Sequence, residues 1–179
     1  MVGHACLSEN SLIGLVDGAC QQVTGLAKLG ACQFKSRQSG LLWGKIQRMK
    51  HIIFIYGTLM PGLRLEAEMQ GARFMGPAQV PGRLVDLGSY PGLLPGEGQV
   101  TGEVYEVDDA QLARLDEVEG VVPGDRAESH YWREEVTVLS GPLQGQQVQT
   151  YVFNRPTEGC TPIAHGDYRR YIREVGRES

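Results

Sequence analysis

The chain has 179 residues, of which 41% are apolar and 21% charged, so it is long enough to bury the core of one globular domain. Its longest apolar runs cover only a few residues, which excludes an integral membrane protein built on spanning helices. The formal net charge of −4 argues against a nucleic-acid-binding protein that relies on a basic face.

Residues 1–48 differ in composition from the rest of the chain. They carry five basic and two acidic side chains, whereas the remainder carries twelve basic and nineteen acidic ones. Frequent glycines interrupt any long helix in this stretch, and no alternation typical of a strand is present. We therefore expect a poorly structured N-terminal extension over 1–48 and one folded domain over 49–179.

Three interpretations of this extension are open. A secretory signal needs a basic start, an unbroken apolar core and a small-residue cleavage site, which the stretch lacks in that order. An organelle transit peptide fits its basic, acid-poor character, although serines and arginines are few. We favour a third interpretation, in which the native protein starts at Met49 and the preceding residues come from an upstream start assignment. Three of the four cysteines lie in the extension without a Cys-x-x-Cys pair, so we expect no zinc site and a reduced, cytoplasmic setting.

The first half of the folded domain reads as strands separated by turns. Residues 51–56 are a run of β-branched and aromatic side chains, which predicts a buried central strand. Gly57 to Gly62 then form a tight turn, and residues 63–69 favour a short helix. We further expect a bent or paired strand over 72–87, a short extended piece over 90–94, a loop over 95–98 and a half-buried strand over 100–107.

The second half adds one amphipathic helix and a hairpin. Asp109 is the expected cap of a helix that carries Leu112, Leu115 and Val118 at helical spacing and ends at Glu119-Gly120. A polar loop over 123–129, a hairpin of strands over 131–139 and 148–154, and a C-terminal helix over 167–175 follow. Because strands dominate without strict βαβ alternation, we predict an α+β fold with a mixed, mainly antiparallel sheet closed into a small barrel-like core with a few short helices.

Familiar nucleotide, nucleophile and metal motifs are incomplete. Gly57 and Gly62 have the spacing of a phosphate-binding loop, but Leu63-Arg64 follow where lysine and a hydroxyl residue are required. No Gly-x-Ser-x-Gly nucleophile elbow is present. The histidines, including His130, are isolated, so we interpret them as structural or surface residues and expect no metal.

Two features point to chemistry. The turn Tyr56-Gly57-Thr58-Leu59 follows a strand directly, and successive backbone N–H groups in such a turn bind carboxylates or stabilise an oxyanion. Glu119 stands at a helix C-terminus, where the helix dipole disfavours an anion, so burial there would raise its pKa toward that of a usable base. When each feature is considered alone, a structural explanation fits equally well. The turn is then an ordinary strand-to-helix connection, and Glu119 is a surface residue at a fraying helix end.

Four motifs in order resemble the γ-glutamylcyclotransferase-like (AIG2-like) family over about residues 50–175. They are Tyr56-Gly57-Thr58-Leu59, Gly102-Glu103-Val104-Tyr105-Glu106-Val107, Leu115-Asp116 with Glu119-Gly120, and Tyr131-Trp132-Arg133. The resemblance implies a small α+β fold with a barrel-like mixed sheet and no metal or organic cofactor. It also implies a cyclotransferase that releases 5-oxoproline from a γ-glutamyl amine or amino acid, because the α-amino group of the substrate attacks its own γ-carbonyl.

The same resemblance assigns roles to individual residues. Glu119 would be the catalytic general acid/base, and the loop of Tyr56, Gly57, Thr58 and Leu59 would bind the substrate. The candidate hydroxyl donors are Tyr105, Tyr151 and Tyr168, and the loop over 121–130 is expected to shape the leaving-group side.

The expected partner is a small γ-glutamyl compound, with neither nucleic acid nor membrane involved. Its leaving amine stays open between a lysine side chain, a free amino acid, a cysteinyl dipeptide and a polyamine. A non-catalytic ligand-binding or interaction module on the same fold is the main alternative, followed by another amide-cleaving enzyme.

Overall fold

The computed structural model describes residues 49–177, so the extension expected over 1–48 lies outside the described residues. The elements follow in the order β1 (Lys50–Ile55), the 3₁₀ helix η1 (Glu66–Met69), β2 (Arg73–Asp86), β3 (Pro91–Asp108), α1 (Asp109–Val118), β4 (Tyr131–Thr137), β5 (Gln147–Phe153), β6 (Thr161–Ile163) and α2 (Tyr168–Glu174). Within this part of the chain, no helix is long and apolar enough to cross a membrane.

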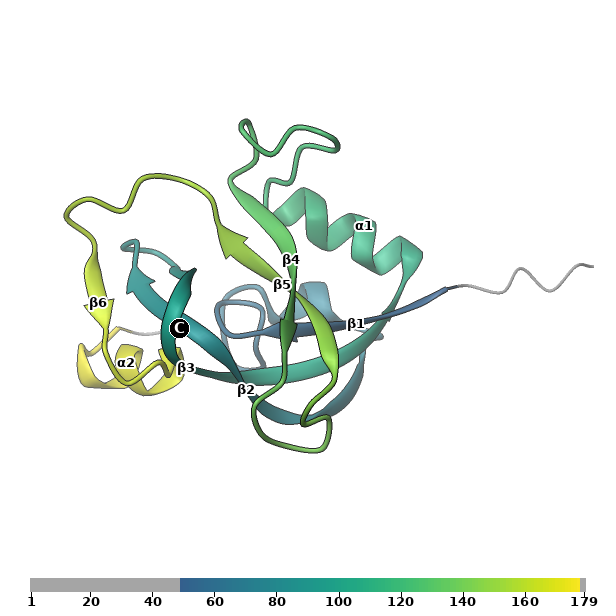
Figure 1. Ribbon diagram of the computed structural model, residues 1–179, viewed down its shortest axis with the longest axis horizontal. Helices are drawn as coiled ribbons and strands as arrows, with labels where there is room; N and C mark the ends of the chain where they lie inside the picture. Colours follow the sequence, from purple (N-terminus) through teal and green to yellow (C-terminus); the bar gives the residue numbers. More distant parts are fainter. Residues whose placement is uncertain (1–48, 178–179) are drawn as a thin grey trace, which may run out of the picture. The chain divides into compact units, whose positions relative to one another are not determined.

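The strands form one mixed sheet in the order β4-β5-β1-β3-β2-β6. β1 pairs with β5 in parallel, and all other neighbouring strands pair antiparallel. The sheet curls into a half-barrel (Figure 1), and the chain after β4 reaches β2 through a hydrogen bond of 2.7 Å from Leu139 N to Gln79 O. The predicted α+β fold with a mixed, mainly antiparallel, barrel-like sheet is confirmed.

The curl depends on a register shift between the two longest strands. β3 runs unbroken from Pro91 to Asp108, so the loop expected over 95–98 is wrong. In its place, Arg83 pairs with Leu94 and Pro81 with Gln99, which sets residues 95–98 opposite the single Gly82. Gly82 has a φ of 148°, which favours glycine and lets the paired strands bend sharply at this bulge.

The central strand and α1 supply much of the core around the later site. Ile53, Phe54 and Ile55 of β1 are at most 2% exposed, as expected for a strand covered on both faces. α1 contacts β1, β3 and η1. Its cap is Asp108 and not the predicted Asp109: the Asp108 carboxylate accepts a hydrogen bond of 2.9 Å from Gln111 N.

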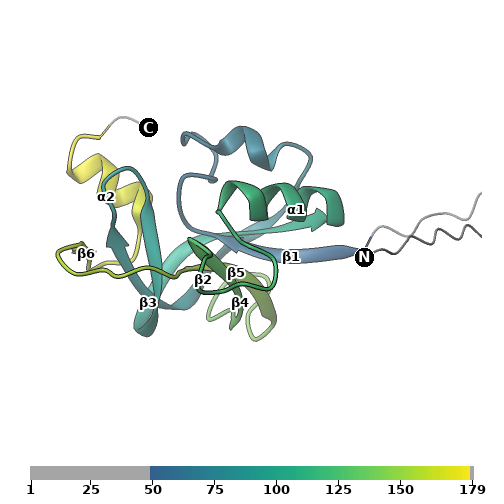
Figure 2. The ribbon, with the colours of Figure 1, turned by 90° about the horizontal axis from the view of Figure 1, so that it is seen from above.

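The two α-helices lie toward opposite ends of the sheet (Figure 2). At the α2 end, the Asp86 carboxylate of β2 accepts hydrogen bonds from both terminal nitrogens of Arg177 and from the Tyr171 hydroxyl. The Arg177 guanidinium holds the pKa of Asp86 at about 2, well below its usual range. These hydrogen bonds hold the C-terminal helix against β2, at the end of the sheet opposite to α1 (Figure 2).

Candidate active site

A cavity of about 220 Å³ opens at the end of β1. Residues from β1, the turn after it, the end of α1 and the starts of β3 and β4 form its wall. Its volume lies below the roughly 300–1,000 Å³ of typical drug-sized sites, which favours a compact metabolite. The lining residues are Phe54, Ile55, Tyr56, Gly57, Thr58, Leu59, Arg64, Leu65, Tyr90, Pro91, Val118, Glu119, His130, Tyr131 and Tyr151.

The turn of Gly57, Thr58 and Leu59 presents three successive backbone N–H groups. Within residues 49–177, none of these three donates a hydrogen bond to a protein acceptor. The turn is nevertheless fixed, because Met60 N donates to Gly57 O and Leu65 N donates to Thr58 O at 3.0 and 2.8 Å. Because these N–H groups are unpaired and their backbone is held in place, they are suited to bind a carboxylate or an oxyanion.

Glycine is required at the first position of this turn. A Cβ built on Gly57 would lie 2.8 Å from Cγ of Pro91, the residue that forms the facing wall of the cavity. Any side chain at position 57 would therefore displace this wall.

Glu119 is held at the junction of α1 and β4. It is the C-cap of α1, and its N–H donates to Leu115 O at 2.9 Å. Its own carbonyl accepts a hydrogen bond of 3.2 Å from Tyr131 N, the first residue of β4. Gly120 has a φ of 66°, a conformation that lets the chain leave the helix abruptly. Glu119 therefore lines the cavity from a backbone that is fixed on both sides.

The environment of Glu119 makes its carboxyl group unusually basic. Burial raises the pKa of Glu119 to about 7, because the anion loses the solvation it would have in water. Among the described residues, no side chain forms a hydrogen bond or ion pair with this carboxylate that would offset the loss. A carboxyl group with a pKa of about 7 takes up and releases protons near neutral pH.

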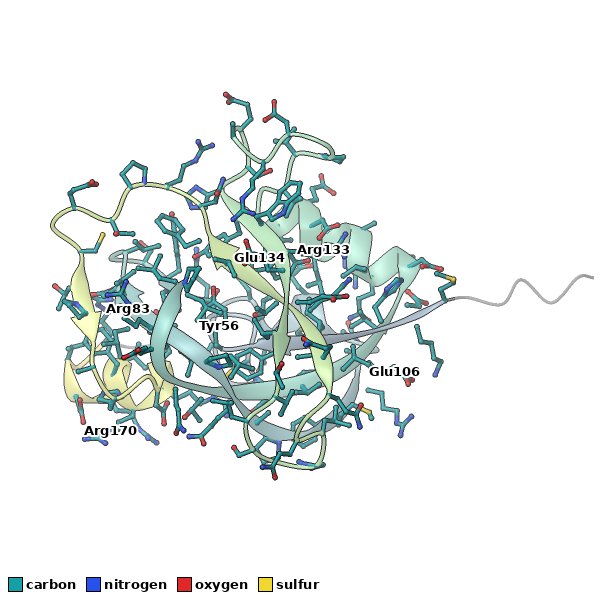
Figure 3. The ribbon with its side chains drawn as sticks, viewed as in Figure 1. Tyr56, Arg83, Glu106, Arg133, Glu134 and Arg170 are labelled. Atoms are coloured by element: carbon teal, nitrogen blue, oxygen red, sulfur yellow. The ribbon has the colours of Figure 1, made fainter. Side chains whose placement is uncertain are left out.

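The hydroxyl groups of the buried tyrosines around the cavity are engaged within the protein. The Tyr56 hydroxyl donates to Tyr151 O at 2.8 Å and accepts from Leu93 N at 3.2 Å. The hydroxyl of Tyr131 donates to Pro91 O, and that of Tyr151 donates to a carboxylate oxygen of Asp116, which is also paired with Arg133. Figure 3 places Tyr56 among the strands, far from peripheral side chains such as Arg170. These hydroxyls therefore build the wall of the cavity.

We expect Tyr56→Phe to lower the free energy of unfolding by about 2 to 3 kcal/mol, since it removes two hydrogen bonds to buried backbone groups. Urea unfolding would measure the loss. Tyr105→Phe is the matched control: it removes one hydrogen bond, to a Glu103 carboxylate that Arg169 also binds, and is expected to lose about 1 kcal/mol. Equal losses in the two variants would contradict the structural role given to the Tyr56 hydroxyl.

Comparison with known proteins identifies the family and supports the fold. A family model described as "Gamma-glutamyl cyclotransferase, AIG2-like" matches residues 53–170, which contain the whole cavity wall. The chain belongs to this family. The family resemblance inferred from the four sequence motifs is therefore confirmed.

Individual relatives agree with this assignment to the AIG2-like γ-glutamyl cyclotransferases. The γ-glutamylcyclotransferase family protein YtfP of Citrobacter rodentium (strain ICC168) is 34% identical over 124 residues, covering 65% of this chain and 93% of that protein. The γ-L-glutamyl-butirosin B γ-glutamyl cyclotransferase of Niallia circulans is 39% identical over 123 residues, covering 66% of this chain and 76% of that protein. A crystal structure of an AIG2-like protein from Mus musculus matches with a TM-score of 0.57 at 27% identity, covering 73% of this chain and 95% of that one. The chain is an enzyme of the γ-glutamylcyclotransferase type.

The cavity of this AIG2-like protein contains most of the predicted site residues. Glu119, the loop of Tyr56 to Leu59, and Tyr151 all line it. Tyr105 and Tyr168 do not: Tyr105 donates its hydroxyl proton to Glu103 at 2.6 Å, and Tyr168 is buried on α2 beside Arg177. Of the loop over 121–130, His130 alone reaches the cavity wall.

Three polar residues of the cavity, His130, Tyr90 and Arg64, were not predicted as site residues. His130, interpreted as structural or surface, lies with its Nε2 3.0 Å from the Tyr90 hydroxyl, and burial lowers its pKa and so favours the neutral ring. Arg64 lines the cavity from the segment after the Gly57 turn. The position of His130 directly before the Tyr131-Trp132-Arg133 motif was the only available hint. No group of His, Cys, Asp or Glu side chains in residues 49–177 is arranged to hold a metal ion.

Proposed function

We propose that this γ-glutamyl cyclotransferase converts a γ-glutamyl amine or γ-glutamyl amino acid into 5-oxoproline and a free amine, with Glu119 as general acid/base. One observation carries the proposal: a carboxyl group with a pKa of about 7 shares a small cavity with three unengaged backbone N–H groups. The relative from Niallia circulans is named for γ-L-glutamyl-butirosin B, a γ-glutamyl compound.

The reaction needs a base because the substrate arrives with its α-amino group protonated. Glu119, in its carboxylate form, removes a proton from this ammonium group, and the resulting amine attacks the γ-carbonyl carbon. One carbon–nitrogen bond forms to close a five-membered lactam, and the original amide bond breaks. Two protons pass overall from the α-nitrogen to the leaving nitrogen, and no water is consumed. A group that both accepts and returns protons near pH 7 is suited to this exchange.

The attacking nitrogen belongs to the substrate, so the protein needs no nucleophile of its own. Its main task is to hold the γ-glutamyl unit folded, with the α-nitrogen against the γ-carbon, and such orientation lowers a barrier by several kcal/mol. The N–H groups of Gly57, Thr58 and Leu59 would bind the α-carboxylate or the oxyanion that develops on the γ-carbonyl oxygen. Their rigidity, given by the hydrogen bond from Leu65 N to Thr58 O, avoids reorganisation during the reaction.

The test is an assay of the purified full chain with γ-glutamyl-L-alanine, γ-glutamyl-ethylamine and Nε-(γ-glutamyl)-L-lysine. We expect 5-oxoproline and the free amine in equal amounts from at least one of them. The matched control is α-glutamyl-L-alanine, whose geometry does not allow the five-membered ring to close with release of alanine. Release of free glutamate would indicate a hydrolase, and no product from any compound would indicate a non-catalytic binding module.

The pH dependence should report the ionisation of Glu119. Since the base must be a carboxylate in the free enzyme, kcat/KM should rise tenfold per pH unit at low pH and level off near pH 7. Initial rates at subsaturating substrate between pH 4.5 and 8.5 would measure this profile. A plateau that begins near the ordinary glutamate pKa of 4.5 would contradict the assignment of the buried carboxyl group as base.

A further inference from the structure

Arg64 brings a fixed positive charge to the wall of the cavity. Among the residues that line it, all in the described part of the chain, Arg64 is the only arginine or lysine. Its backbone is held beside the substrate-binding turn, because Leu65 N donates to Thr58 O and Glu66 N donates to Leu63 O at 2.8 and 3.0 Å. The side chain of Arg64 is therefore anchored next to the substrate-binding turn.

Within residues 49–177, the Arg64 guanidinium forms no hydrogen bond or ion pair, and its charge acts only on the nearby Tyr168 hydroxyl. The nearby carboxylates are engaged elsewhere: Glu66 accepts from Gly62 N, and Glu68 pairs with Arg114. Most other arginines of the domain bind a carboxylate or a backbone carbonyl, among them Arg133 and Arg169. An arginine left free at a cavity wall is available for an anionic group of a ligand.

Arg64 is the more exposed of the two carboxylate or guanidinium residues that line the cavity. Its side chain is exposed, whereas Glu119 is only partly exposed. Burial raises the pKa of Glu119, whereas the charge of Arg64 acts on the Tyr168 hydroxyl of α2, whose pKa burial raises and Arg64 lowers in part. The α-carboxylate of the substrate shares its carbon with the α-amino group and must stay near Glu119. The free N–H groups of the Gly57 to Leu59 turn serve this α-carboxylate, which leaves Arg64 for an anion at the other end of the substrate, the leaving amine.

We propose that Arg64 binds a carboxylate on the leaving amine, so that the enzyme prefers γ-glutamyl amino acids and peptides to γ-glutamyl amines without a carboxylate. This inference rests on the proposed function and narrows its substrate class. A polyamine leaving group is excluded on the same ground, because its positive charges would meet the guanidinium.

Two substrates test the contact between Arg64 and the leaving-group carboxylate. γ-Glutamyl-L-alanine and γ-glutamyl-ethylamine differ only in that carboxylate. With the full chain, we expect kcat/KM to be about tenfold higher for γ-glutamyl-L-alanine. Arg64→Ala should remove this preference by raising KM for γ-glutamyl-L-alanine about tenfold, with the values for γ-glutamyl-ethylamine within twofold of wild type. Arg64→Lys, which keeps the charge but loses the two-pronged geometry, should be intermediate.

The control variant is Arg173→Ala, which removes the same charge from an exposed position of α2 outside the cavity and should leave both substrates unaffected. As a positive test, Arg64→Glu should favour γ-glutamyl-(2-aminoethyl)amine, whose leaving group is a cation. Equal losses on both substrates in Arg64→Ala would overturn the inference while leaving the cyclotransferase function in place, as would no change on either. Absence of 5-oxoproline from every substrate with the wild-type chain would overturn the proposed function and this inference together.

Discussion

Glu119→Gln is expected to reduce kcat for 5-oxoproline release by about a thousandfold, within the range that a positioned general base contributes. Glutamine has the same shape as glutamate but neither accepts nor returns a proton, so substrate binding should change little while turnover is lost. Steady-state kinetics on the full chain would measure both parameters. Glu117→Gln is the matched control, because Glu117 lies on the same turn of α1, is exposed and does not line the cavity. Turnover within a few fold of wild type in Glu119→Gln would contradict the assigned role.

The same substitution should stabilise the protein at alkaline pH. The pKa of Glu119 is about 7 in the folded chain against an ordinary value of 4.5, so its protonated form is favoured by folding. The stability gained from this protonation is complete below about pH 4.5 and is lost as the pH rises through about 7. At pH 8, Glu119→Gln should therefore unfold with a free energy up to about 3 kcal/mol larger than wild type, a difference that shrinks toward pH 5. A variant less stable than wild type at pH 8 would contradict the burial of an unpaired carboxylate.

Gly102→Ala is expected to lower the free energy of unfolding by about 3 kcal/mol, at the upper end of the cost of overpacking. A Cβ at position 102 would lie 2.2 Å from Ile55 O and 2.6 Å from the Phe54 ring. Neither group can yield easily, since both belong to the buried central strand β1. Because Ile55 directly precedes the substrate-binding turn, the folded fraction of this variant should also have a lower kcat/KM.

Chemical denaturation and the 5-oxoproline assay would measure these two effects. Gly145→Ala is the control: Gly145 has a φ of 83° but nothing within 4 Å of its added Cβ, so it reports the backbone strain alone, about 1 kcal/mol. A loss in Gly102→Ala no larger than in Gly145→Ala would show that β1 does not depend on this close approach.

The sequence predicted those helices and strands whose own residues show a clear local pattern. The β-branched run over 51–56, the helical spacing of Leu112 and Leu115, and the Glu119-Gly120 end all correspond to observed structure. The prediction of a loop over 95–98 was wrong. Pro95 and the three following residues have the composition of a loop, but they lie in a bulge within the paired strand β3. The three-residue β6 was not predicted, since a strand this short has no periodicity to detect.

The family motifs selected only some of the residues that line the cavity. Glu119 and the Tyr56 turn were selected because they stand in contiguous motifs. Arg64 and His130 were not selected, because they lie outside these motifs and the sequence does not reveal the strand order that brings the ends of β1 and β4 to one cavity. Tyr105 illustrates the converse: it lies in a motif, but its strand directs the hydroxyl to Glu103 and away from the cavity.

The parallel pairing of β1 with β5 also dictates when the site is built during synthesis. The Tyr56 hydroxyl bonds to the carbonyl of a residue 95 positions later, so the nascent domain has its substrate-binding turn long before the wall that supports it. Contacts of such sequence separation form late and slow the folding of small domains. Ribosome-bound chains that end before β5 should therefore expose apolar side chains of β1 that the complete domain buries.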